Sequence, residues 1–140
     1  MENSKKVKVT NRHLIEYNGL IAQVAQKQLP PKVSFTLARN TEHTDAIVKT
    51  FFKEKEKIVD QYVEKGSDGK PKLTENGLDF IYKSDKEKAA FKKALDELMD
   101  YENDVEVRKI KLDDLKDSDG KPISFSAAEF RAIDFMLDGE

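Results

Sequence analysis

The sequence predicts an α+β fold that is mainly helical, with about four helices, one of them long, and a small, mostly antiparallel sheet. Apolar residues recur at helical spacing along much of the 140-residue chain. Short stretches near residues 6 and 105 alternate apolar and polar residues, which is typical of strands. Two serines followed three residues later by glutamate mark helix starts. The length fits a single domain, residues 1–140, that can bury a hydrophobic core.

The first elements are a strand and a helix. Residues 6–10 alternate, with two valines on one face, and predict the strand. Thr10 or Asn11 then caps a helix, because either side-chain oxygen can accept a hydrogen bond from a free amide of the first turn. Pro30 ends this helix, since it forces Leu29 out of the helical conformation. The apolar positions of the helix are Leu14, Tyr17, Leu20, Ile21, Val24 and Ala25.

A long helical segment follows at about residues 32–65. Apolar residues keep helical spacing from Val33 to Val63, and Gly66 is a natural stop. As one helix it would run about 32 residues and roughly 48 Å. A helix of that length either projects from the core or packs against another copy of itself. The polar window 39–45 interrupts the apolar stripe, so two helices with a break there are the alternative.

The second half of the chain predicts two more helices and further strands. Residues 72–83 read as a hairpin that turns at Asn76-Gly77. Capping boxes open one helix at Ser84 and a final helix at Ser126. A strand begins near Val105, and the change of apolar face after it indicates a β-bulge.

Composition excludes several function classes. The 27 acidic and 25 basic residues give a net charge of −2, so no overall field favours nucleic acid or an anionic membrane. The absence of cysteine excludes disulfides, thiolate metal sites and cysteine nucleophiles. No apolar run approaches the roughly 20 residues needed to span a bilayer. The basic N-terminal segment lacks the apolar core of a signal peptide, so we expect a cytoplasmic protein.

The pentapeptide SDGKP occurs twice, at residues 67–71 and 118–122. A phosphate-binding P-loop needs serine or threonine after the lysine, and both copies have proline there. Both copies also lack several of the acidic ligands of a calcium loop. Aspartate, glycine and proline are the residues that turns require, and both copies lie between expected elements. We therefore interpret the repeat as two turns.

No motif predicts catalysis or a cofactor. His13 and His43 would approach each other if the first two helices formed a hairpin, and nearby carboxylates could complete a metal site. However, no HExxH or HxH spacing fixes two ligands on one face. Nucleophile-elbow and dinucleotide-binding motifs are missing as well. We expect no enzyme activity, no cofactor and no metal. Lys5, Lys6 and Lys8 form a basic cluster that could contact phosphates, but it has no aromatic partners and no matching basic helix, so we interpret it as a solvated end and expect no nucleic-acid partner.

The charges of the long helix are the most informative surface feature. One row at i, i+4 spacing holds Lys49, Lys53 and Lys57, and a second holds Glu56, Asp60 and Glu64. Pairs at i, i+3 across the rows are typical of a solvated helix face. The alternative is a surface complementary to an antiparallel copy, which would give a homodimer, or to a charged partner. The candidate partner-binding residues are Arg39, Lys49, Phe52, Lys53, Glu56, Lys57 and Asp60.

Several segments share a recognisable pattern, in order, over nearly the whole chain. They are Val9–Arg12, residues 29–40 (LPPKVSFTLARN), 68–71, 105–107, 110–115, 123–124 and 133–136. Together they resemble a family of small uncharacterised proteins encoded by siphophages and prophages of Gram-positive bacteria. The resemblance implies a phage origin and the host bacterial cytoplasm as the place of synthesis. It implies no activity, because the role of that family is unsettled.

Two function classes fit these observations. The first is a phage-encoded, non-enzymatic binding protein that acts by protein–protein contact on a bacterial host protein, as an inhibitor or adaptor, including one directed against host defence. The second is an accessory protein of the virion or its assembly, in the tail or head. Near the start of the long helix, Arg39 and Asn40 are candidate contact residues, with a structural role as the alternative for Asn40. Asn40 falls on the buried row, where one polar residue can fix helix register.

Overall fold

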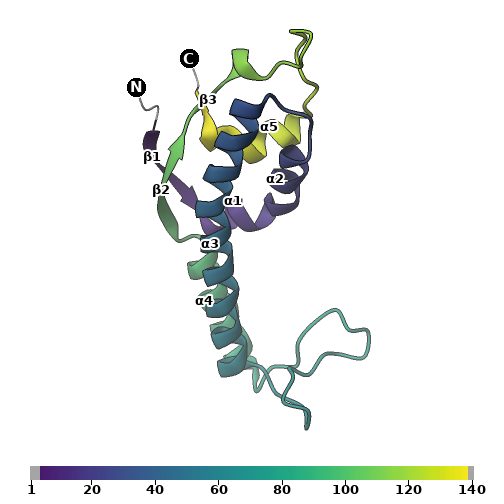
Figure 1. Cartoon of the computed structure of the whole chain (residues 1–140). Coiled ribbons are helices and arrows are strands. Elements are labelled where there is room, and N and C mark those ends of the chain that lie inside the picture. The colour runs from purple at the N-terminus through teal and green to yellow at the C-terminus, as the bar shows by residue number, and fades with distance from the viewer. Residues whose placement is uncertain (1–3, 139–140) are drawn as a thin grey trace. The chain divides into compact units, whose positions relative to one another are not determined.

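The computed structural model describes residues 4–138, which form five α-helices, two short 3-10 helices and four strands (Figure 1). This composition confirms an α+β fold that is mainly helical. The chain divides into two compact units. Unit 1 comprises the chain up to Val48 together with the chain from Glu102 onward, and unit 2 comprises Lys49–Tyr101.

The long helix, α3, is continuous from Pro31 to Tyr62. The polar window 39–45 does not break it, because the backbone hydrogen bonds of a helix do not depend on which side chains face the core. Proline suits the first helical position, where its missing N–H would have no partner. Residues up to Val48 belong to unit 1 and the remainder to unit 2. Val63, just past the helix, forms an isolated β-bridge with Tyr82.

An antiparallel two-stranded ribbon builds one side of unit 1. Strand β1 (Ser4–Thr10) pairs with β2 (Glu102–Arg108) along its whole length. The alternation of side chains buries Val9, Val105 and Val107 on one face, while most of the charged residues lie on the other. These bounds confirm both strands expected from the sequence.

Two short helices follow β1, where the sequence indicated one. Helix α1 (Asn11–Glu16) is capped by the Thr10 hydroxyl, which accepts a hydrogen bond from the His13 amide at 3.1 Å. Helix α2 (Asn18–Ala25) begins after a single intervening residue, Tyr17. Its first residues, Asn18-Gly19, are weak helix formers, which accounts for the break. Helix α2 then packs against the last helix, α5.

The end of the chain closes unit 1. Strand β3 (Ile110–Lys111) pairs in parallel with β4 (Leu137–Asp138). The apolar side chains change face after β2 because the chain there pairs with a new strand. The β-bulge predicted at this place is therefore wrong. The 3-10 helices are η1 (Leu112–Asp114) and η2 (Asp134–Met136).

Helix α5 (Ala127–Ile133) starts with the expected capping box. The Ser126 amide donates to the Glu129 carboxylate at 2.8 Å, and the Glu129 amide donates to the Ser126 hydroxyl at 3.0 Å. Glu129 is buried, and its second carboxylate oxygen lies 3.3 Å from the Lys27 ammonium. The Ser126 bond, with a further contribution from Lys27, lowers the pKa of Glu129, although burial acts in the opposite direction.

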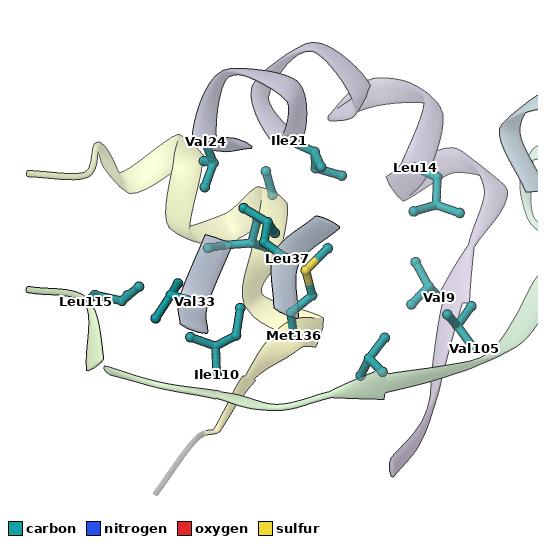
Figure 2. Packing of buried hydrophobic residues seen from close by; sticks show 13 residues of the cluster. Val9, Leu14, Ile21, Val24, Val33, Leu37, Val105, Ile110, Leu115 and Met136 are labelled. Atoms are coloured by element: carbon teal, nitrogen blue, oxygen red, sulfur yellow. The ribbon is translucent and has the colours of Figure 1, made fainter. Parts of the chain in front are cut away.

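The core of unit 1 is a single cluster of aliphatic side chains. Figure 2 shows them converging from the ribbon, α1, α2, the first half of α3 and the C-terminal helices. Leu14, Leu37 and Met136 are almost completely inaccessible to solvent. The other members of the cluster are Val9, Ile21, Val24, Val33, Val105, Val107, Ile110, Leu115, Ala132 and Ile133.

Unit 2 pairs the second half of α3 with α4 (Asp85–Met99), which lie side by side in Figure 1. Val59, Val63 and Phe91 form its buried cluster. The Ser84 hydroxyl caps α4 as expected, accepting from the Glu87 amide at 3.1 Å. The intervening hairpin forms through isolated bridges, including Leu73 with Phe80, and has no continuous ladder.

Both SDGKP segments are turns of the same form. Gly69 and Gly120 both have φ of +79°, a conformation that favours glycine. In each case the chain re-pairs across the turn, Lys65 with Pro71 and Lys116 with Pro122. The interpretation of the repeat as two turns is confirmed.

Candidate functional site

A cleft of about 550 Å³ lies in unit 1, between the first half of α3 and the end of β2. We call it the α3–β2 cleft. Helix α3 contributes Phe35, Thr36, Arg39, Asn40 and His43. Residues 106–108 of β2 form the facing wall, and Ser4 of β1 completes it. The cleft therefore joins segments that lie more than 60 residues apart in the sequence.

Asn40 fixes the two walls to each other. Its side chain is 2% exposed, and its amide nitrogen donates to the Arg108 carbonyl at 2.9 Å. The Arg108 amide donates back to the Asn40 side-chain oxygen, also at 2.9 Å. One side chain thus satisfies both backbone groups of Arg108, as a neighbouring strand would. The buried position expected for Asn40 from the sequence is confirmed, and its two bonds join α3 to β2 at one point.

The edge of β2 beside the cleft carries backbone hydrogen-bonding groups. Strand β1 occupies the other edge. Because Arg108 directs its amide and carbonyl to Asn40, it forms a non-hydrogen-bonded pair with Ser4 in the ladder. The alternation repeats every two residues, so Glu106 directs its own N–H and C=O to the cleft edge. A ligand in the cleft therefore meets a backbone donor and acceptor.

The charged side chains of the cleft are mainly basic. Arg39 and Arg108 come from opposite walls, and His43 lies one helical turn beyond Arg39, whereas Glu106 is the carboxylate of the lining. The Arg39 guanidinium is 3.3 Å from the Glu42 carboxylate, with both side chains more than half exposed. Such a surface pair is weak and is easily exchanged for another carboxylate. The cleft therefore suits an acidic group better than a basic one.

Phe35 adds an apolar contact to this basic surface. Its side chain is 66% exposed, although it stands on the same helix as the buried Val33 and Leu37. An aromatic ring at a wet surface gains free energy when a partner covers it. Arginine and aromatic residues together are the side chains most enriched where proteins bind one another.

The structure distributes the seven candidate residues over two places. Arg39 lines the α3–β2 cleft. The other six are exposed on the second half of α3, in unit 2, where Phe52 is half exposed and its ring meets that of the buried Phe51 edge-to-face at 5.4 Å. These six are Lys49, Phe52, Lys53, Glu56, Lys57 and Asp60.

Unit 2 has a second, smaller cleft of about 360 Å³, between the hairpin and α4. Its wall is largely apolar, with Phe80, Tyr82 and Phe91 beside the strongly exposed Leu78. Burial and the neighbouring Asp79 raise the pKa of Tyr82, so its phenol remains a neutral hydrogen-bond donor. This cleft lacks the grouped arginines of the α3–β2 cleft.

The two histidines have different surroundings. A His13 ring nitrogen is 2.9 Å from the Ala132 carbonyl, and the ring contacts those of Tyr17 and Phe135. His13 is therefore a packed residue of unit 1, whereas His43 is exposed at the α3–β2 cleft. Between residues 4 and 138, no group of three or more His, Cys, Asp or Glu side chains is placed to hold a metal ion.

Sequence reasoning missed most of the cleft. Phe35 carried a usable signal, since it falls off the buried row of Val33 and Leu37 and is therefore expected at the surface. Residues 106–108 carried none, because their position beside α3 depends on the tertiary structure and on the Asn40 bonds.

Comparison of the chain with protein-family models, with curated proteins and with solved structures finds no match. The phage origin therefore stays a prediction from the resemblance. Within the described part of the chain, no helix is long and apolar enough to cross a membrane.

Proposed function

We propose that this chain is a non-enzymatic binding protein that acts by protein–protein contact, and that the α3–β2 cleft is its contact surface. The observation that carries the proposal is the exposed Phe35 beside Arg39 and Arg108, at a cleft that a folded scaffold holds open. Aromatic residues and arginine are enriched at protein–protein interfaces relative to the rest of the surface. In keeping with the family resemblance, the partner is a bacterial host protein, and the chain is its phage-encoded inhibitor or adaptor.

The chemistry of the cleft defines the partner surface. An acidic side chain would enter between the two arginines and displace Glu42 from Arg39. An apolar side chain next to it would cover Phe35. Nucleic acid fits less well, because Glu42 and Glu106 would lie close to its phosphates.

The proposal is tested by capture during phage infection. Tagged chains are expressed as wild type, as Arg39→Glu and as Arg131→Glu, and co-purifying proteins are quantified by mass spectrometry. Arg131 is exposed on α5 and outside the cleft, so Arg131→Glu controls for the change of charge. One host protein recovered with wild type and Arg131→Glu, and lost with Arg39→Glu, supports the proposal.

Two other results would contradict it. Equal recovery with all three chains would remove the cleft as the contact surface. Recovery of tail or capsid proteins, with the tagged chain in purified particles, would identify an accessory protein of the virion or its assembly.

A further inference from the structure

The solvent face of α3 in unit 2 carries a straight stripe of four charged residues. Lys49, Lys53, Glu56 and Asp60 follow one another at spacings of four, three and four, which keeps them in line on one side of a helix. All four are exposed, while Phe51 is buried on the opposite side. Along the helix the stripe therefore reads two positive charges and then two negative ones.

Among two-fold symmetric pairs, that order is complementary to itself only in the antiparallel orientation. An antiparallel copy presents its two acids opposite the two lysines and its two lysines opposite the two acids. For a two-fold axis level with the midpoint between Glu54 and Lys55, Lys49 lies opposite Asp60 of the second copy. Lys53 then lies opposite Glu56 of the second copy. A parallel copy in the same register would instead set lysine against lysine and acid against acid, which is repulsive.

The two-fold symmetry doubles each contact, because the same patch serves both copies. Four ion pairs would then lie along about 16 Å of helix, given the rise of 1.5 Å per residue. Phe52 flanks the stripe and is half exposed. Its ring therefore adds apolar area along one side of the contact.

Three of the four charges that would pair form no ion pair within the described part of one chain. Over the described residues 4–138, Lys49, Lys53 and Glu56 form no ion pair, whereas Asp60 is 2.8 Å from Lys65. An exposed pair of this kind is weak, so a second copy can compete with Lys65 for Asp60.

We propose that two copies of this chain associate through antiparallel pairing of this stripe. The surface lies in unit 2 and the α3–β2 cleft in unit 1, so the proposal is independent of the function assigned to the cleft. Because surface ion pairs dominate the contact, the dimer is weak and loses affinity as salt concentration rises.

Sedimentation equilibrium on four chains and one control tests the pairing: the four are Lys53→Glu, Glu56→Lys, the double variant Lys53→Glu/Glu56→Lys, and wild type. Each single reversal sets like charges against each other twice, and should raise the dimer dissociation constant at least about tenfold. The double variant restores opposite charges at both contacts and should return the constant to the wild-type range. Lys92→Glu, on the exposed face of α4, is the charge-matched control and should behave as wild type.

Far-UV circular dichroism confirms that each variant keeps its helices. A wild-type chain that stays monomeric up to about 1 mM, a range that includes very weak contacts, would overturn the proposal. So would a dimer that both single reversals leave intact. A double variant that remains dissociated would overturn the stated register, since another antiparallel register sets Lys53 against Asp60 and gains nothing from the swap.

Discussion

Replacing Asn40 by alanine should destabilise unit 1 strongly, although the residue is polar. The substitution removes two hydrogen bonds of 2.9 Å and leaves the backbone amide and carbonyl of Arg108 without those partners. An unsatisfied buried group costs about 1–3 kcal/mol. Because Arg108 lines the cleft, water can reach it, so the lower part of that range applies to each group. We expect a loss of about 2–3 kcal/mol, a large share of the 5–15 kcal/mol typical of a folded domain.

Urea unfolding followed by circular dichroism measures this loss. The midpoint should fall by about 1–2 M with an unchanged slope. Asn18→Ala, at an exposed position of α2, is the matched control and should change stability by less than about 0.5 kcal/mol. Hydrogen exchange gives a local readout, since the Arg108 amide should exchange faster in Asn40→Ala. Equal midpoints for the two variants, or an unchanged Arg108 exchange rate, would refute the role assigned to Asn40.

Three further predictions concern stability. The pKa of Glu129 in the folded chain is lowered from 4.5, so the stability that its ionised form contributes is complete above about pH 4.5 and is lost as the pH falls through the folded value. Glu129→Gln should therefore flatten the decline in urea midpoint between pH 7 and pH 3. An unchanged decline would contradict this. Gly120→Ala should cost about 1–2 kcal/mol of stability because φ at this turn is +79°. Gly19→Ala, in an open helical position, should instead stabilise the chain by about 0.5–1 kcal/mol. Thermal midpoints that shift in the same direction for the two variants would contradict the backbone conformations assigned to these glycines. Phe91→Ala should destabilise unit 2 by about 3–5 kcal/mol, measured by chemical denaturation, and a cost below about 1 kcal/mol would mean that the ring is not part of a packed core.

Local signals in the sequence predicted much of the fold. Thr10, Ser84 and Ser126 all cap the helices at which they were expected, because a cap depends on residues within one turn. Both SDGKP turns likewise follow from local backbone preferences. The break at Tyr17 was missed because the apolar spacing continues across it, while the weak helix formers that follow carry no apolar signal.

Features that depend on distant residues could not be predicted. The parallel pairing of β3 with β4 joins residues about 27 positions apart, and nothing local distinguishes it from the expected bulge. The candidate site is similar. Arg39 was identified from its position on the long helix, but its neighbours on β2 lie more than 60 residues later in the sequence. Only the folded chain shows that Asn40 and Arg108 meet there.

Site-specific photo-crosslinking tests the central claim, that the α3–β2 cleft contacts another protein, most directly. A photoreactive phenylalanine analogue replaces Phe35 in one chain and Tyr101 in another, and both are irradiated in phage-infected cells. Tyr101 is similarly exposed and lies outside the cleft, so it controls for random encounters. The account predicts one predominant crosslinked protein at position 35 and none at position 101. The same products at both positions, or none at position 35, would contradict it.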